Sequence, residues 1–415
     1  MSNSKIAVSI ICLGIGEDAK KLKRCLTSIA PYIDRIFVTL TGQRKEIEEA
    51  KKVCDEFNAH ISYYRPFWTV TKRACRWLTN YLGYEPHMQV GDRLFLFDKA
   101  RNFNFSQIPK EYLWLFWIDS DDILVNGENL WKLKEIADQA GIEAFLIKYV
   151  YLATFDKYGN VKNILIEHIR ERMVKNIGVY KWVAPIHEVL SETRPTTKTY
   201  VDDCYVLHLI GYKHIQNVMN RDLKNLELAV YQSKGKDPRH LYNLSKGYID
   251  FQTPEGDEKA IPLLKAFLWG KYQSEWSEER AEAYEHLANI YKSKGELNNA
   301  VKACMLALEE DPERQSVFIT LASIYTDRKD WEKALFWINI LNKIPEKLTT
   351  LTVNPRDVKL KGLVVSYNAY LNLAKVDNAY NAVVKMLKII PNDLAAKESY
   401  REITKKKIQS MVVEL

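Results

Sequence analysis

Three carboxylates within four residues are the strongest chemical signal in the chain. Asp119-Ser120-Asp121-Asp122 directly follows the apolar run 113–118, which is typical of a buried strand. Carboxylates this close repel one another, so the arrangement is costly unless a cation or hydrogen-bond donors offset the charge. Hard oxygen ligands favour Mg²⁺ or Mn²⁺, which commonly also bind phosphate oxygens. The alternative is an acidic turn in which Asp122 caps a helix, but the position after a buried strand favours a metal site.

Two further polar pairs have the chemistry to act beside such a metal. Arg101-Asn102 lies in a helix-like segment, where Arg101 can either neutralise phosphate with its forked donors or pair with Asp98 on the helix surface. His187-Glu188 follows an aromatic-rich stretch, and Glu188 has the chemistry of a general base that deprotonates an acceptor. Because adjacent residues on a strand face opposite sides, at most one residue of that second pair is expected to point into a site.

Alternating strand and helix patterns supply the framework for these residues. Apolar runs predict strands at 6–13, 35–40, 60–64, 113–118 and 144–155. Amphipathic spacing predicts helices at 18–29, 45–58, 98–106 and 130–140. This order predicts an α/β fold with a doubly wound sheet, in which sites form at the carboxyl ends of strands. The acidic cluster stands at one of those ends.

The segment 66–93 interrupts this alternation and is unusually aromatic and basic. It contains Trp68 and Trp77 together with Lys72, Arg73 and Arg76. A connection of this length in a compact domain is usually functional or flexible. Its aromatic rings can stack on an acceptor while its cations hold negative charge. The alternative is that the two tryptophans pack beneath a long loop or in a dimer contact.

The C-terminal half changes to helical periods that repeat. Aromatic, small and helix-breaking residues recur in successive copies at 281–314, 315–345 and about 360–391, with a degenerate first copy at 239–271. This spacing is typical of the tetratricopeptide repeat of about 34 residues. We therefore predict an α/β domain at 1–215 followed by an all-α repeat domain at 216–415. Such repeats indicate a surface for protein contacts, including a homodimer, rather than chemistry.

Composition narrows the class of protein. The 415 residues carry a formal net charge of +7, which suits an anionic substrate without requiring nucleic acid. None of the six cysteines forms a CxxC pair, so a structural zinc site is not expected, and their scatter suits a reducing cytoplasm. Neither a signal peptide nor an apolar run long enough to cross a membrane is found. We therefore expect a cytoplasmic protein.

Taken in order, the motifs resemble a known enzyme family. The matching segments are VSIICLGIGEDAKKLKRCLTSI, FDKARNFNFS, WLFWIDSDDIL, YKWVAPIHEVL and VLHLIGY, followed by the helical repeats. Together they resemble family 2 glycosyltransferases, and most of all the bacterial type that joins a catalytic domain to tetratricopeptide repeats, such as the sublancin-type peptide S-glycosyltransferases. The resemblance implies a GT-A-like fold that binds a nucleotide-sugar and transfers the sugar with inversion.

The resemblance also implies roles for individual residues. Asp119 and Asp121 match the family's DxD element and would bind Mn²⁺ or Mg²⁺, and His208 matches a later histidine that is a further metal ligand. By itself, His208 in an apolar stretch is typical of a buried core histidine. Residues expected to contact the donor are Asp98, Arg101, Asn102, Asp119 and Thr39. Arg101 would stabilise the leaving diphosphate, and either Glu188 or Asp122 would act as the catalytic base.

One departure from the family pattern concerns the nucleobase. The second strand normally ends in an aspartate that contacts the base, whereas 37–43 contains no carboxylate, and Thr39, Thr41 or Gln43 must serve instead. A UDP-sugar remains the expected donor, and the acceptor is open between peptide, glycan and modified nucleic acid. Two other functions remain: a non-catalytic scaffold with a degenerate transferase fold and partner-binding repeats, and a nucleotidyl-transfer enzyme with paired carboxylates.

Overall fold

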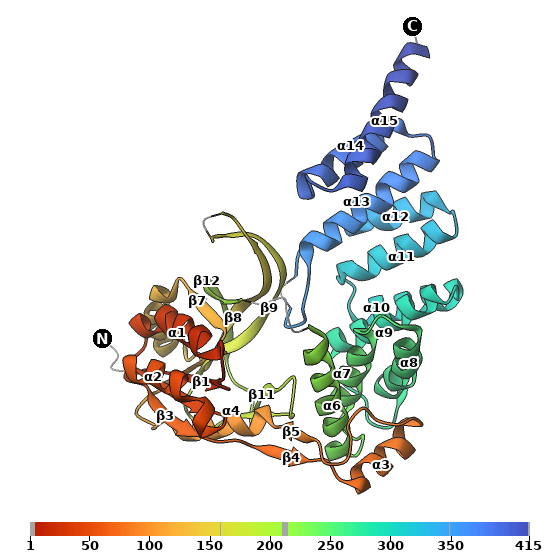
Figure 1. Ribbon diagram of the computed structural model, residues 1–415. Coiled ribbons are helices and arrows are strands. Elements are labelled where there is room, and N and C mark those ends of the chain that lie inside the picture. Colours follow the sequence, from red (N-terminus) through yellow and green to blue (C-terminus); the bar gives the residue numbers. More distant parts are fainter. Residues whose placement is uncertain (1–4, 158, 210–214, 348, 414–415) are drawn as a thin grey trace. The chain divides into compact units, whose positions relative to one another are not determined.

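The computed structural model describes residues 5–157, 159–209, 215–347 and 349–413. The chain divides into two compact units, Met1–Ala260 and Ile261–Leu415. The first is a mixed α/β unit and the second is helical throughout its described part (Figure 1). This division lies beyond the change of pattern at 215/216, because the first helices after the sheet pack with the α/β unit.

An eight-stranded sheet forms the centre of the first unit, in the order β3-β2-β1-β6-β9-β8-β12-β7. Its strands are β1 (Ile6–Cys12), β2 (Arg35–Leu40), β3 (His60–Tyr63), β6 (Trp114–Trp117), β7 (Asp122–Val125), β8 (Ala144–Phe155), β9 (Val161–Lys175) and β12 (Lys198–His208). The first four strands in this order are parallel, whereas β9 pairs antiparallel with both β6 and β8. The sheet is therefore mixed, and the α/β class expected from the sequence is confirmed.

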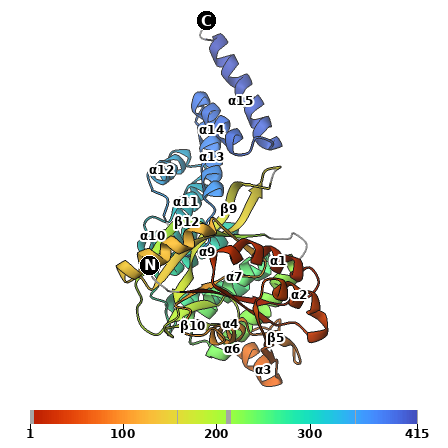
Figure 2. The ribbon, with the colours of Figure 1, turned by 90° about the vertical axis from the view of Figure 1, so that its left-hand side faces the viewer.

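Both faces of the sheet are covered, because side chains alternate along β1. Ile6, Val8 and Ile10 join a core that contains residues of α1 (Asp18–Ile29), α2 (Glu48–Glu56) and α5 (Leu130–Ala140). Ala7 faces the opposite way, into a second core that includes Phe105 of α4 (Phe97–Ser106). The small hairpin of β10 (Tyr180–Val183) and β11 (Val189–Glu192) packs on this second face. Figure 2 shows α1 and α2 beside one another.

The aromatic and basic segment 66–93 is structured rather than a bare loop. It contains β4 (Phe67–Thr69), α3 (Lys72–Leu82) and the start of β5 (Arg93–Phe95). Helix α3 begins where the Thr71 side chain accepts a hydrogen bond from the Ala74 amide, 3.2 Å away. The helix ends at Gly83, whose φ of +82° suits glycine. Capping at both ends explains why this segment folds as a helix.

The aromatic rings of this segment pack against α6 (Ile215–Ser233). Trp77 stacks on Tyr81 with ring centroids 4.8 Å apart, and its edge meets Tyr231 of α6 at 5.7 Å. Trp68 lies at the same distance, 5.7 Å, from the Tyr231 ring. The two tryptophans thus have packing partners within the unit, which favours the structural interpretation of this segment over acceptor stacking.

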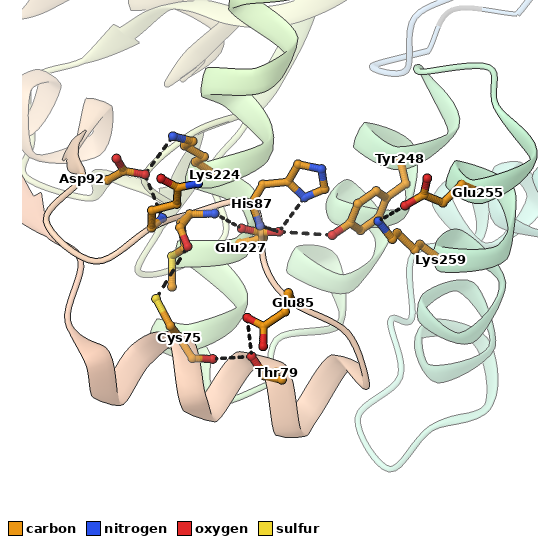
Figure 3. A network of polar contacts seen from close by, with 12 residues as sticks. Cys75, Thr79, Glu85, His87, Asp92, Lys224, Glu227, Tyr248, Glu255 and Lys259 are labelled. Atoms are coloured by element: carbon orange, nitrogen blue, oxygen red, sulfur yellow. Dashed lines mark hydrogen bonds and ion pairs between the residues drawn. The ribbon is translucent and has the colours of Figure 1, made fainter.

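A buried carboxylate ties the same segment to α6 and α7 (Pro238–Ile249). Glu227 is fully buried and accepts hydrogen bonds from the His87 and Met88 amides, each at 2.8 Å. It also accepts one from the Tyr248 hydroxyl at 3.2 Å (Figure 3). Nearby, Lys224 pairs with Asp92 at 2.8 Å. These contacts explain why the compact unit extends past residue 215.

The second unit is a series of helix pairs (Figure 1). After α8 (Pro254–Trp269), the helices are α9 (Ser277–Ser293), α10 (Leu297–Glu310), α11 (Gln315–Asp327), α12 (Trp331–Leu341), α13 (Pro355–Asn372), α14 (Val376–Ile389) and α15 (Leu394–Val413). Fully buried alanines such as Ala288, Ala300 and Ala322 let neighbouring helices approach closely. Among the described residues of either unit, no helix is both long and apolar enough to cross a bilayer.

Candidate functional site

Arg101 joins two carboxylates that come from different elements. From α4, its Nε donates to Glu188 Oε1 at 2.6 Å and its terminal nitrogen donates to Asp119 Oδ1 at 2.5 Å. The guanidinium lies over the rings of Trp117 and Trp182, at 5.2 and 4.9 Å from their centroids. Arg101 forms its ion pairs with these two acids, whereas Asp98 pairs with Lys99. The helix-surface ion pair is therefore excluded.

A second arginine, Arg172 of β9, lies behind the acidic cluster. Its side chain is only 1% exposed, with nitrogens 3.9 Å from Asp119 and 3.6 Å from Asp122. Its guanidinium carbon lies 3.8 Å from the centroid of the Trp117 ring. Although burial opposes ionisation, the attraction of Arg101 and Arg172 lowers the pKa of Asp119 below its usual value. Sequence reasoning missed Arg172, whose only signal was an arginine beside the apolar Met173-Val174.

Three potential metal ligands converge at the pairing of β7 with β12. His208 lies opposite Asp122 in this antiparallel pair. One ligand atom each of Asp121, Asp122 and His208 lies within 4.8 Å of the others. His208 Nδ1 is 2.8 Å from Asp122 Oδ1 and 3.8 Å from Asp121 Oδ1. The cluster thus contains Asp122 in place of the expected Asp119, because Asp119 is turned toward Arg101.

The pKa shifts of Asp122 and His208 show that negative charge is concentrated in this cluster, which a bound cation would offset. Burial raises the pKa of Asp122 to about 6, and the nearby Asp119 adds to the shift. The pKa of His208 is raised because its hydrogen bond to Asp122 and the surrounding carboxylates outweigh burial. The Oδ2 atom of Asp122 is buried without a hydrogen-bond partner. Two carboxylates, one of them with an unsatisfied oxygen, and an imidazole are a donor set that Mn²⁺ or Mg²⁺ fits.

Asp122 does not match its expected role as a catalytic base. It is fully buried, and besides His208 it accepts a hydrogen bond from the Tyr149 hydroxyl at 3.2 Å. A carboxylate enclosed in this way cannot reach an acceptor, so Glu188 is left as the candidate base. Tyr149 had no signal in the sequence beyond its place in an apolar strand.

Three expected donor contacts are also corrected. Thr39 is fully buried, and its hydroxyl bonds Asn104 and Ser62, each at 2.8 Å. The amide of Asn102 exchanges two hydrogen bonds with the backbone of Trp182, at 2.8 and 2.9 Å, and so holds α4 to β10. Asp98 is buried beside Lys99, 3.3 Å away. In each case the polar atoms are bound to other groups of the protein itself.

The His187-Glu188 pair lies in the turn between β10 and β11, not on a strand. The turn backbone has positive φ at Ala184 and His187, +78° and +48°, so the alternation of strand side chains does not apply. The turn presents Glu188 to Arg101 while His187 is exposed. The last residues of the VLHLIGY motif, 210–212, lie outside the described residues.

Comparisons with known proteins match only part of the chain. No family model and no curated protein matches it. Among solved structures, the first tetratricopeptide domain of RPAP3 bound to an HSP90 peptide is 19% identical, covers 32% of this chain and 98% of its own, with a TM-score of 0.28. PilF of Pseudomonas aeruginosa is 14% identical, covers 47% and 77%, with a TM-score of 0.35. MamA is 19% identical, covers 48% and 99%, with a TM-score of 0.33.

The helical unit has a polar hollow of its own. A volume of about 220 Å³ is lined by side chains of α9, α11 and α13. Lys292 on α9 and Lys361 on α13 contribute positive charge, each paired with an aspartate at 3.1 and 2.7 Å. Thr320 on α11 donates to Asn289 on α9 at 3.4 Å. The hydroxyl, amide and charged groups that these three helices contribute to the hollow can bind a polar segment of a polypeptide.

Proposed function

We propose that the N-terminal unit is a metal-dependent glycosyltransferase that moves a sugar from a nucleoside diphosphate to an acceptor. The observation that carries this proposal is that Arg101 links Glu188 to Asp119, two residues before the Asp121-Asp122-His208 cluster, at the carboxyl end of β6. There the strand order reverses between β1 and β6, a point where ligands bind in open α/β sheets. The ordered motifs that resemble family 2 glycosyltransferases support the same reaction.

Glu188 has the geometry of a base that is held in place and still able to accept a proton. Arg101 binds one of its oxygens, Oε1, and among the described residues Oε2 has no hydrogen-bond partner. Oε2 would take the proton from the acceptor as the acceptor attacks the anomeric carbon. A general base needs this arrangement, in which one carboxylate oxygen is held in place and the other is free to take the proton.

Asp121, Asp122 and His208 would hold the metal, with Arg172 balancing the charge behind them. A bound Mn²⁺ or Mg²⁺ supplies electrostatic stabilisation of the leaving diphosphate. Arg101 fixes Asp119 and Glu188, so that its own charge remains beside the reacting groups. Arg101 would therefore act by holding Glu188 and Asp119 in position and by its positive charge.

The test is the Mn²⁺-dependent release of nucleoside diphosphate from a panel of sugar nucleotides. We expect Asp121→Asn to abolish this release and Glu188→Gln to reduce transfer at least about a hundredfold while donor binding persists. Glu111→Gln is the control, because Glu111 is an exposed carboxylate, 60% accessible, whose ion pair is with Lys5 and not with a residue of the candidate site. Release that is independent of metal, or normal transfer by Glu188→Gln, would exclude this mechanism.

A partner-binding scaffold is the second candidate, and the polar hollow on α9, α11 and α13 favours it. In that case the repeats would bind a polypeptide and the α/β unit would not turn over donors. The solved structure of RPAP3 was determined with an HSP90 peptide, which makes a peptide a reasonable partner to try. The sugar-nucleotide panel separates the two candidates, since a scaffold gives no metal-dependent release from any donor.

A further inference from the structure

Helix α3 carries a row of cations on its solvent side. Lys72, Arg73 and Arg76 are exposed, whereas Ala74 and Leu78 are fully buried. Because residues three or four apart are neighbours on a helix surface, Arg76 lies beside both Arg73 and Lys72. The helix therefore presents three positive charges to solvent within its first two turns.

No acid of α3 neutralises this row, since the helix contains none. Within the part of the chain that the structure describes, Lys72, Arg73 and Arg76 form no ion pair. Glu85 follows the helix, and it accepts a hydrogen bond from the Thr79 hydroxyl at 3.4 Å near the C-terminal end of α3 (Figure 3). The positive charge at the start of the helix is therefore not offset by the protein itself.

The three cations also stand at the end of the helix where they are least favourable. The helix dipole places partial positive charge at the N-terminus, so acids stabilise the first turn and cations destabilise it. Helix α3 has no acid in that turn and begins instead at the Thr71 cap. Placing cations there weakens the helix, and a negatively charged ligand on this face gives a physical reason for them.

Two stacked rings and a further cation lie beside the row. Trp77, the residue after Arg76, stacks on Tyr81 with the ring planes at 11°, and Tyr81 is 41% exposed. Lys234, an exposed residue just after α6, lies 4.9 Å from the centroid of the Trp77 ring. A fixed ring next to cations offers an apolar contact to the sugar or base of a nucleotide.

The hairpin of β4 and β5 joins α3 to α4 (Figure 1). Arg93 of β5 is exposed, and its guanidinium lies 4.6 Å from the centroid of the Phe67 ring. Just after β5, the Phe97 amide donates to the Pro185 carbonyl at 3.1 Å, in the turn that presents Glu188. Arg93 thus adds a cation on the element that connects α3 with the candidate site.

A row of cations suits a ligand that carries a row of negative charges. Nucleic acid has one such charge on every phosphate, and contacts from Lys and Arg to phosphates bind it without regard to sequence. The forked donors of arginine match two phosphate oxygens. An anionic bilayer is bound most strongly where apolar side chains can insert, but Ala74 and Leu78 of α3 are buried. Nucleic acid is therefore the better match.

We propose that Lys72, Arg73, Arg76, Arg93 and Lys234 form a basic face that binds the phosphate backbone of a nucleic acid. Binding through this basic face is independent of sequence, weakens with salt and needs no metal. The inference does not depend on the proposed glycosyl transfer. Where both hold, nucleic acid is the class of acceptor that reaches the candidate site.

The test measures binding of a labelled DNA of about 20 nucleotides, single-stranded or duplex, to the full chain by fluorescence anisotropy in EDTA at about 50 to 200 mM salt. We expect the triple variant Lys72→Gln/Arg73→Gln/Arg76→Gln to bind at least about tenfold more weakly at the lowest salt. Its plot of log affinity against log salt should be shallower by about 2 to 3, the loss of three phosphate contacts. Tyr81→Leu should weaken the single strand more than the duplex.

The matched control is Lys23→Gln/Lys51→Gln/Lys52→Gln, which removes the same charge from exposed positions of α1 and α2. The control should keep the affinity and salt slope of wild type. The α3 variant should fold, because it removes cations that oppose the helix dipole, and urea midpoints check this.

Several outcomes would overturn the inference. These are the absence of DNA binding by wild type, and an equal loss in the α3 variant and the control. Tighter binding of a heparin fragment than of either DNA would assign the basic face to an anionic glycan. Loss of binding to phosphatidylserine vesicles in the α3 variant, with DNA binding retained, would assign it to a membrane. Failure of the proposed function is a separate result, since it appears as absent metal-dependent release from sugar nucleotides.

Discussion

At the residue scale, the negative charge of Asp119 is balanced by two arginine side chains. Arg101 and Arg172 approach it from opposite elements, α4 and β9. This leaves Asp121 and Asp122, with His208, as the carboxylates that a metal can share. Three neighbouring aspartates therefore divide into two roles because their surroundings differ, which spacing along the chain cannot show.

His168 of β9 should make stability depend on pH. Burial, with Arg170 and Arg172 adding to it, lowers the pKa of His168 to about 2, far below the value of about 6.5 in an unfolded chain. Since only the unfolded state takes up the proton near pH 6, the stabilisation is complete above about pH 6.5 and declines below it. We expect a loss of about 2 kcal/mol between pH 7.5 and pH 5 from this residue alone.

Urea unfolding of wild type and His168→Gln at both pH values checks this expectation. The variant should lose about 2 kcal/mol less than wild type on acidification, whatever its stability at neutral pH. His60→Gln is the matched control, because the His60 side chain is exposed. Parallel pH profiles for wild type and His168→Gln would contradict the assignment.

At the scale of elements, short polar contacts position the parts that carry the candidate site. Asn102 binds the backbone of Trp182 and so holds the β10–β11 hairpin against α4. This brings Glu188, in the hairpin turn, to Arg101 on the helix. In the same unit, Glu227 of α6 accepts hydrogen bonds from the backbone of the segment after α3.

Glu227→Gln should destabilise the N-terminal unit. The fully buried carboxylate accepts from two backbone amides and from the Tyr248 hydroxyl, and a glutamine would place an NH₂ group against one of these donors. An unsatisfied buried donor costs about 1–3 kcal/mol. Urea midpoints give the measurement, with Glu255→Gln as the control because Glu255 is 78% exposed in its pair with Lys259. Equal midpoints for the two variants would show that the network carries little stability.

At the scale of the whole molecule, the compact α/β unit includes α6 and α7, although the sequence pattern assigned these helices to the repeat domain predicted from residue 216. A fragment that ends at 215 would leave the His87 and Met88 amides without Glu227, and Trp77 without Tyr231. We expect this fragment to be insoluble or to unfold at much lower urea than a fragment that ends at 272. Matching circular dichroism spectra and matching midpoints for the two fragments would show that α6 and α7 are dispensable.

Local periodicity and residue type predicted many of the elements and the kind of chemistry, but not α3, β9 or β12. Apolar runs located β1, β2, β6 and β8, amphipathic spacing located α1 and α4, and the repeat spacing indicated helix pairs. Residue type singled out Arg101, Asp121 and Glu188, whereas His208 became a candidate only through the family resemblance.

Only the tertiary structure decided which polar atoms remain available, because burial and partners depend on contacts between segments far apart in the chain. Asn102, Thr39 and Asp98 have suitable chemistry in the sequence, yet their polar atoms are enclosed or bound by the protein itself. Arg172 had no motif and became part of the site because β9 enters the sheet antiparallel beside β6. A pattern along one strand cannot report which strand lies next to it, and that neighbour determines the charge at the site.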